Sequence, residues 1–151
     1  MGKLKEQILL FQFRDEERLR AIRRVLSDLH IPSRVLTADS WPQKIGHLLD
    51  AKGFPPAAVP PGESFDFPHE VMLFSQIKGK RLDMVLCALR DAGLESVRYK
   101  AVVTPFNTLW TLRHLCETMQ KEHAYLAERA GGAALPPEES SESVGEGGEN
   151  V

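Results

Sequence analysis

The stretch "EVMLFSQIKGKRLDMVLCALRDAGL" (residues 70–94) opens with an apolar run of strand length. It continues with apolar residues at the spacing of one helix face. The earlier stretch "QILLFQFRDEERLRAIRRVLSDLHI" (residues 7–31) aligns with it without a gap, residue 8 against residue 71, at an offset of 63. This similarity predicts an internal repeat in which each copy contributes a strand followed by a helix.

The two predicted helices carry equivalent apolar stripes and recognisable end signals. Asp15, Glu16 and Glu17 place negative charge at the positive end of the first helix dipole. Gly93 is typical of the residue that ends a helix, and it follows the second stripe. The stripe residues are Leu19, Ile22, Val25, Leu26 and Leu29 in the first copy and Leu82, Val85, Leu86 and Leu89 in the second.

Each copy is followed by a second strand and a second helix. "SRVLTA" (33–38) precedes "SWPQKIGHLL" (40–49), where Ser40 is an expected N-cap with Pro42 in the first turn, and "SVRYKAVV" (96–103) precedes a long helical stretch after Thr104. The order βαβα occurs twice, so the strands within each half should be parallel. We therefore predict an α/β fold, a single layered domain from two fused βαβα half-repeats around a four-stranded sheet. The sequence does not determine the strand order.

The predicted domain covers residues 1–130, with half-repeats at 6–50 and 69–130. Between them, the proline-rich linker 51–68 is expected to be extended, with Phe54, Phe65 and Phe67 packing back onto the domain. Residues 131–151 contain five glutamates, no basic residue and few apolar ones, and we expect a disordered acidic tail.

Charge and composition exclude several classes of protein. All 19 Lys and Arg precede residue 131, together with 16 of the 21 acids, and this slight excess argues against a nucleic-acid-binding protein. No apolar run approaches the roughly 18 residues of a membrane span. With no export signal and only Cys87 and Cys116, a cytoplasmic protein with reduced thiols is expected.

No known catalytic or cofactor motif is present, and we expect no catalytic residue, no metal and no cofactor. One helix carries a basic run, which we interpret as a solvated face with Glu16–Arg20 as an i,i+4 pair. The run consists of Arg14, Arg18, Arg20, Arg23 and Arg24.

The last helix has two different faces if it begins at Thr104–Pro105, where Thr104 would be the cap and Pro105 the first helical residue. The face predicted to pack on the sheet contains Leu109, Leu112, Leu115, Cys116, Met119 and Leu126. The outer face contains Asn107, Trp110, His114, Thr118, Lys121 and Tyr125. A tryptophan away from the core must pack on a loop, on another helix or on a partner, so a partner protein or a second copy of the chain is one expectation for this outer face.

The junction also fits a ligand site. A strand end that leads into a helix start is a common anion-binding place in α/β proteins. Lys100, Thr104, Asn107 and Trp110 would line one mouth there. The capping interpretation and the ligand interpretation both remain open at this point.

The segments "EVMLFSQI", "LDMVLCALRDAGL", "YKAVVTPFNTLW" and "LCETMQKEH" resemble a small bacterial family, the domain of unknown function 3783. Its pattern Lys-Ala-x-x-Thr-x-x-Asn-x-x-Trp corresponds to Lys100, Ala101, Thr104, Asn107 and Trp110, with Glu122 and His123 further on. The resemblance covers residues 68–123, and 7–50 more loosely. Gln43, in a Gln-x-Ile-Gly segment, joins the candidates. Gln76 departs from the pattern, which has glycine there.

The resemblance names no reaction. Two functional hypotheses remain, and the first is a non-catalytic binding or regulatory module. The alternative is an enzyme with a cleft near Lys100 and Asn107 that acts on a small anionic substrate. If the halves are related by a pseudo-twofold axis, Gln43 and Asn107 begin equivalent helices and could face one shared cleft.

Overall fold

The computed structural model describes residues 5–94 and 97–129, with side chains up to residue 122. The chain divides into two units, Met1–Cys116 and Glu117–Val151. The expected tail 131–151 lies outside the described residues, as do the side chains of Tyr125 and Leu126. All contacts below belong to the first unit.

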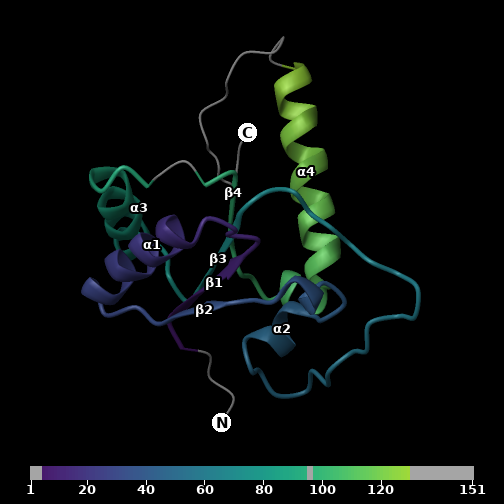
Figure 1. Cartoon of the computed structure of the whole chain (residues 1–151). Helices are drawn as coiled ribbons and strands as arrows, with labels where there is room; N and C mark the ends of the chain where they lie inside the picture. Colours follow the sequence, from purple (N-terminus) through teal and green to yellow (C-terminus); the bar gives the residue numbers. More distant parts are fainter. Residues whose placement is uncertain (1–4, 95–96, 130–151) are drawn as a thin grey trace. The chain divides into compact units, whose positions relative to one another are not determined.

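A four-stranded sheet organises the first unit, in the order β2-β1-β3-β4 (Figure 1). Its strands are β1 (Gln7–Phe11), β2 (Ser33–Val35), β3 (Val71–Ser75) and β4 (Tyr99–Val102). β1 is parallel to β2, and β3 is parallel to β4, as predicted. The central pair, β1 and β3, is antiparallel, so the structure supplies the strand order that the sequence left open.

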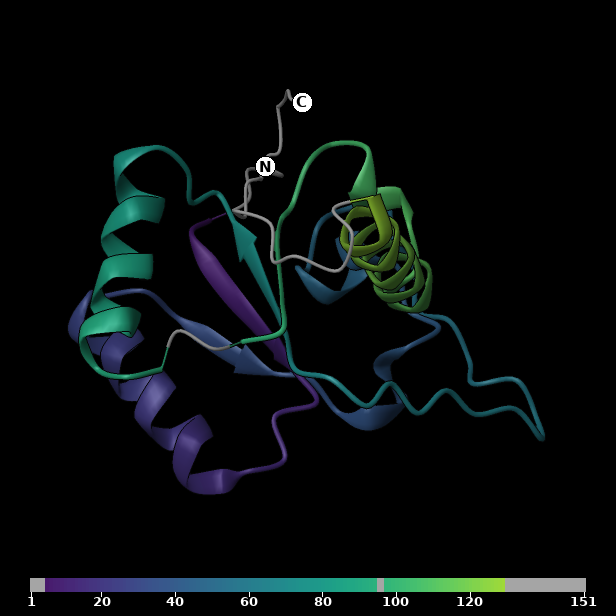
Figure 2. The same ribbon diagram turned by 90° about the horizontal axis from the view of Figure 1, so that it is seen from above.

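The helices are α1 (Glu16–Asp28), α2 (Ile45–Leu48), α3 (Lys80–Asp91) and α4 (Leu112–Arg129), with 3-10 turns η1 (Ala38–Ser40) and η2 (Asn107–Leu109). Helices α1 and α3 have similar lengths of 13 and 12 residues, whereas α2 has only 4 and α4 has 18. α1 and α3 lie side by side over one face of the sheet, and α2 lies on the other side (Figure 2). This confirms an α/β fold in layers.

The central strands β1 and β3 are buried along their whole length. Such continuous apolar strands need cover on both faces of the sheet. On the face under α1 and α3, side chains from both halves form one core: Ile8, Leu10, Phe13, Ile22, Leu26, Ile31, Met72, Phe74, Ile77, Val85, Leu89 and Val97. The predicted helical stripes of both copies pack into or against this core. Each half therefore completes the core of the other.

The predicted signals at the ends of α1 and α3 are confirmed. The Asp15 carboxylate accepts hydrogen bonds from the backbone N–H groups of Glu17 and Arg18, which are free donors at a helix start. Gly93 has a φ of 74°, and its N–H donates to the carbonyl of Arg90. A left-handed residue of this kind ends a helix with little strain only when it lacks a Cβ.

The predicted starts of the two later helices are wrong. Ser40 and Pro42 do not begin α2, which starts at Ile45 after η1 and an extended Lys44. Thr104 and Pro105 do not begin α4, which starts at Leu112. In both places a 3-10 turn and an extended residue come before the helix.

The two helix starts are joined by backbone hydrogen bonds. The N–H of Ile45 donates to the carbonyl of Trp110, and the N–H of Leu112 donates to the carbonyl of Gln43, both at 2.9 Å. Lys44 and Thr111 form an antiparallel bridge between these bonds. The halves therefore exchange equivalent contacts here as well as across β1 and β3, although the internal repeat itself stays a prediction.

The linker packs back through its phenylalanines, as predicted. Phe67 is buried, and Phe65 stacks on it with ring centroids 5.7 Å apart. Phe65 also contacts Trp41, which is buried, and Arg113 lies over both of these rings at 5.2 and 5.6 Å. Phe54 is half-buried against Gly46, where a Cβ would meet its ring at 2.5 Å. The linker is therefore part of the fold.

Two arginine–glutamate pairs tie the halves together in a reciprocal way. Arg18 on α1 binds both carboxylate oxygens of Glu70, the residue before β3. Arg81 on α3 binds both oxygens of Glu6, the residue before β1, at 2.9 and 3.0 Å. Arg81 also donates to the carbonyl of Leu29 at the end of α1. We name these the crossed ion pairs.

The Glu6–Arg81 pair predicts a pH dependence of stability. Hydrogen bonds from Arg81, supported by its charge, hold the pKa of the Glu6 carboxyl below its ordinary value, although partial burial acts in the opposite direction. A lowered folded pKa contributes stability above the unfolded value of about 4.3, and this is lost as pH falls through the folded pKa. In urea unfolding between pH 6 and 3, Glu6→Gln should therefore lose less stability than the wild type.

A matched control is Glu63→Gln, since Glu63 is exposed and has no ion pair among the described residues. This variant should follow the wild-type pH profile. An identical profile for Glu6→Gln and the wild type would contradict a role for the pair.

Candidate functional site

The segment after β4 forms a compact turn that Asn107 holds in place. The Asn107 side chain accepts a hydrogen bond from the Thr104 N–H at 2.8 Å and donates one to the Val102 carbonyl at 3.1 Å. In return, the Thr104 hydroxyl accepts a hydrogen bond from the Asn107 N–H at 3.1 Å. Asn107 is only 9% exposed, so the amide is an internal brace of the turn.

The braced turn presents apolar side chains to solvent. Phe106 is 80% exposed and Leu109 is 60% exposed. The predicted helix faces are therefore wrong at this end, because the chain is not yet helical at these positions. Leu109 was expected in the core and is outside, whereas Asn107 was expected outside and is buried. From Leu112 onward the prediction is confirmed for Leu112, Leu115 and Cys116, which are buried.

Trp110 lies between η2 and α4 with an extended backbone (ψ 150°). It is half-buried, and its ring meets the His114 ring edge-to-face with centroids 4.7 Å apart. Its carbonyl accepts the hydrogen bond from Ile45 that joins the two helix starts. Trp110 therefore follows the exposed residues Phe106 and Leu109 in the sequence, but its own side chain is half-buried.

Gln43 lies at the corresponding place before α2. Its side chain donates to the Ala57 carbonyl at 2.6 Å and accepts from the Ala57 N–H at 2.8 Å, which holds the linker. Lys100 is exposed on the edge strand β4, and its ammonium donates to the Val97 carbonyl at 3.1 Å. The backbone bridge brings the segments of Gln43 and Trp110 together.

The side chains of Gln43 and Asn107 form hydrogen bonds with different backbone segments, Gln43 with Ala57 and Asn107 with Thr104 and Val102. A cleft shared by these two residues stays a prediction.

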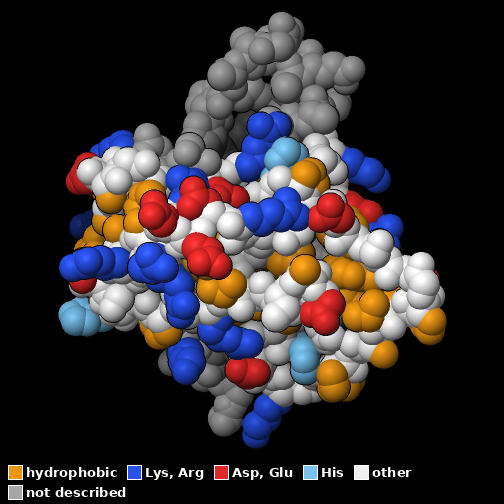
Figure 3. Space-filling model, viewed as in Figure 1, with side chains coloured by type: hydrophobic (Ala, Val, Ile, Leu, Met, Phe, Trp, Pro, Cys, Tyr) orange, Lys and Arg blue, Asp and Glu red, His pale blue; other side chains and the backbone are white. Residues whose placement is uncertain are grey.

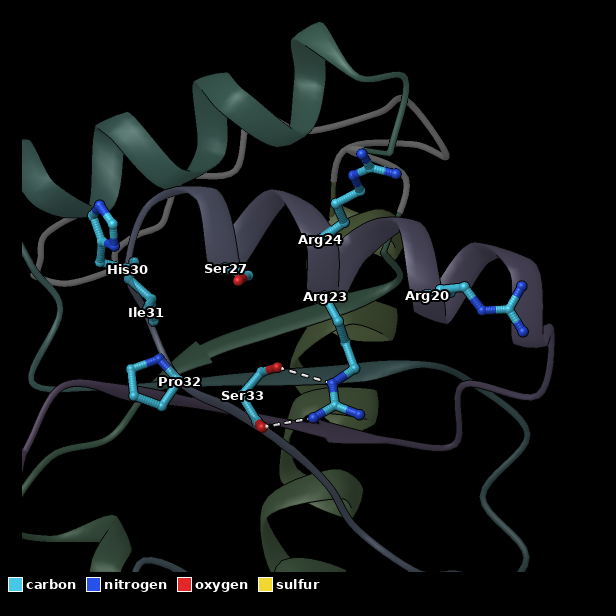
Figure 4. A pocket seen from close by; sticks show the side chains of 8 residues that line it. All are labelled: Arg20, Arg23, Arg24, Ser27, His30, Ile31, Pro32 and Ser33. Atoms are coloured by element: carbon cyan, nitrogen blue, oxygen red, sulfur yellow. Dashed lines mark hydrogen bonds between the residues drawn. The ribbon is translucent and has the colours of Figure 1, made fainter.

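A second candidate site is a groove of about 760 Å³ that the sequence interpretation did not identify. It lies along α1 and the start of the edge strand β2, and none of the five predicted residues lines it. Its lining consists of Arg20, Arg23, Arg24, Ser27, His30, Ile31, Pro32 and Ser33 (Figure 4). Positive, polar and apolar side chains are present, and no acidic one. We name it the basic groove.

The signal for the basic groove was present in the sequence as an arginine run on α1. The sequence analysis interpreted the run as one solvated helix face. In the structure, some of its arginines form ion pairs and the others line the basic groove. Arg14 and Arg18 form ion pairs with Asp66 and Glu70. The expected Glu16–Arg20 pair is absent from the ion pairs of the described residues, so the groove arginines are not neutralised in that way.

Two further properties limit the chemistry of the described part of the chain. No group of three or more His, Cys, Asp or Glu side chains could hold a metal ion there. Within the same residues, no helix is both long enough and apolar enough to cross a membrane.

Comparison with known proteins gives one match. Residues 70–126, from β3 into α4, match the family described as Domain of unknown function (DUF3783). The predicted resemblance is thereby confirmed over the second half of the fold. No curated protein and no solved structure is detectably similar to the chain. The match names no activity, so function must be argued from the sites themselves.

Proposed function

We propose that the chain is a non-catalytic binding module that uses the turn Thr104–Trp110 to contact another protein. The observation that supports this proposal is the combination of a braced backbone with two large exposed apolar side chains. Phe106 and Leu109 are the most exposed of the large apolar residues described. A turn without a binding role would be expected to carry polar residues at these positions.

Binding through an ordered turn has a physical advantage. Association costs free energy for every segment that must become ordered. The Asn107 brace orders this turn before any partner arrives, so less is lost when Phe106 and Leu109 become buried. Aromatic side chains that enter a pocket on the partner also contribute a large share of binding energy. We therefore expect the partner to have an apolar pocket large enough for a phenyl ring.

The brace also bears on the enzyme alternative near Lys100 and Asn107. Both polar atoms of the Asn107 amide are engaged with backbone groups of the turn. Each atom could take a second partner, but the side chain is only 9% exposed, so a substrate would reach it only after the turn had rearranged. A binding surface keeps these hydrogen bonds intact, and this favours the binding module.

The test is photo-crosslinking with a photoreactive amino acid at position 106 of the full chain, expressed in the source organism. The control carries the same amino acid at Val59, which is 40% exposed in the linker. We expect a protein adduct at position 106 that position 59 does not give. The captured protein, once purified, should bind wild type at least about tenfold more tightly than Phe106→Ser/Leu109→Ser, equivalent to about 1.4 kcal/mol.

Two results would overturn the proposal. One is the same set of adducts from both positions, and the other is equal affinity for wild type and the double variant. If the captured protein is the chain itself, light scattering of purified protein should show a dimer that the double variant does not form. A monomer at all concentrations would exclude that partner.

A further inference from the structure

The hydrogen-bond donors of the basic groove come from α1 and from the start of β2. The Arg23 guanidinium reaches across from α1 and donates to the Ser33 hydroxyl at 3.1 Å and to the Ser33 carbonyl at 3.2 Å (Figure 4). These bonds use two of its five N–H donors and hold it at the start of β2. Arg20 and Arg24 leave the same helix in other directions (Figure 4). The Arg23 guanidinium is therefore held by the protein, whereas Arg20 and Arg24 make no side-chain hydrogen bond or ion pair among the described residues.

In the part of the chain that the structure describes, no acidic side chain lines the groove. Arg20 and Arg24 have no ion pair among the described residues, whereas Arg14, just before α1, and Arg18, on α1, do. Figure 3 shows Lys and Arg side chains gathered over α1 and β2. Because the three guanidinium groups carry the same charge and no described acidic side chain lines the groove, an anion bound there would be attracted by all three.

We propose that the basic groove binds a small organic phosphate. Arg20, Arg23 and Arg24 lie within little more than one turn of α1, so their backbone positions span only about 6 Å along the helix axis. Planar guanidinium groups bind phosphate oxygens through paired N–H donors, which a lysine cluster cannot do. The Ser27 and Ser33 hydroxyls add short-range partners. Pro32, exposed at one end, offers an apolar surface for the organic part of the ligand.

The extent of the charge favours a small ligand over a nucleic acid. At one end of α1, Asp15, Glu16 and Glu17 are exposed, and at the other end Asp28 is exposed. On β2, the next basic residue, Arg34, pairs with Asp50 at 3.1 Å. A polymer needs phosphate contacts that continue along the surface. Here the unpaired positive charge ends within the groove, which suits one or two phosphate groups.

The test is calorimetric titration of the full chain with inorganic pyrophosphate. The variant is Arg20→Gln/Arg24→Gln, which retains the Arg23–Ser33 contact and changes only exposed side chains. The control is Arg14→Gln, an arginine of the same helical region that does not line the groove. We expect wild type and control to bind pyrophosphate alike, and the double variant to bind at least about tenfold more weakly. Circular dichroism should show that all three proteins are folded.

A second arm separates a small phosphate from nucleic acid. A 12-nucleotide single strand is titrated at low and at physiological salt, with and without excess pyrophosphate. Pyrophosphate binding that needs Arg20 and Arg24, with little oligonucleotide binding at physiological salt, supports the proposal. No wild-type binding of millimolar pyrophosphate, equal binding by the double variant, or binding of the oligonucleotide alone would overturn it.

Discussion

Replacement of Asn107 by alanine is expected to lower the free energy of unfolding by about 2 kcal/mol. The substitution removes both side-chain hydrogen bonds of the brace, to the Thr104 N–H and the Val102 carbonyl. A partly buried backbone group that loses its partner costs about 1–3 kcal/mol. The measurement is urea unfolding of the full chain, with an unchanged m-value as the sign that stability alone has changed.

A control for this experiment is available in the same turn. The Thr108 hydroxyl donates to the Pro105 carbonyl at 2.8 Å from an exposed position. Since water can replace that bond, Thr108→Ala should cost less than about 0.5 kcal/mol. Equal effects of the two substitutions would mean that Asn107 does not brace the turn. In that case the argument for a rigid contact surface would also fail.

The second large effect concerns Arg18, which joins α1 to the residue before β3. Its guanidinium and the Glu70 carboxylate form three hydrogen bonds of 2.9–3.2 Å, with side chains only 19% and 21% exposed. Paired charge-assisted hydrogen bonds at a partly buried site are stronger than ordinary surface ion pairs. We expect Arg18→Met to destabilise the fold by about 1–2 kcal/mol, since Glu70 then loses its partner.

A double-mutant cycle isolates this interaction. Arg18→Met, Glu70→Gln and the double variant are compared with the wild type by urea unfolding. The coupling energy should be about 1 kcal/mol, because each single substitution already removes the pair. The matched cycle on Arg14 and Asp66, whose side chains are 55% and 85% exposed, should give a coupling close to zero. Similar couplings for both cycles would contradict a special role for the partly buried pair.

The sequence predicted the elements whose signals are local. The apolar pattern predicted β1, α1, β3 and α3 and the side chains that they bury. Asp15 and Gly93 marked the start of α1 and the end of α3. The strand order could not be predicted, because it depends on which edges of the two halves meet, and both β1 and β3 are apolar on both faces. The order is set by pairing between β1 and β3, whose partner residues lie about 60 or more positions apart in the sequence.

The candidate turn shows where periodicity fails. Thr104, Pro105 and Asn107 are all residues that are common at helix starts. The sequence pattern therefore predicted a single helix that begins at Thr104–Pro105. Tertiary contacts determined the outcome, since the backbone bridge at Thr111 requires an extended strand-like residue before Leu112. Moving the helix start by a few residues reverses which side chains are inside. This explains the exchange of Asn107 and Leu109.

The departure at Gln76 also has a physical explanation. The resemblance to the family implies a glycine at this position, directly after β3. In this chain Gln76 has a φ of 60°, in the left-handed region that favours glycine. The backbone at this position therefore favours a glycine, and the glutamine here adopts the left-handed conformation with some strain. Gln12, directly after β1, has a φ of 65° and repeats this feature in the first half.

The antiparallel pairing of β1 with β3 has a consequence for how the chain folds. Leu9 lies opposite Leu73, so the centre of the sheet joins residues that are far apart in the sequence. Closing so long a loop costs entropy before any contact in the shared core compensates for it. Folding should therefore be governed by the meeting of the two halves, and neither half should be stable while it waits. A ribosome would have to release β3 before β1 gains its second neighbour beside β2, so the first half stays exposed to chaperones and proteases during synthesis.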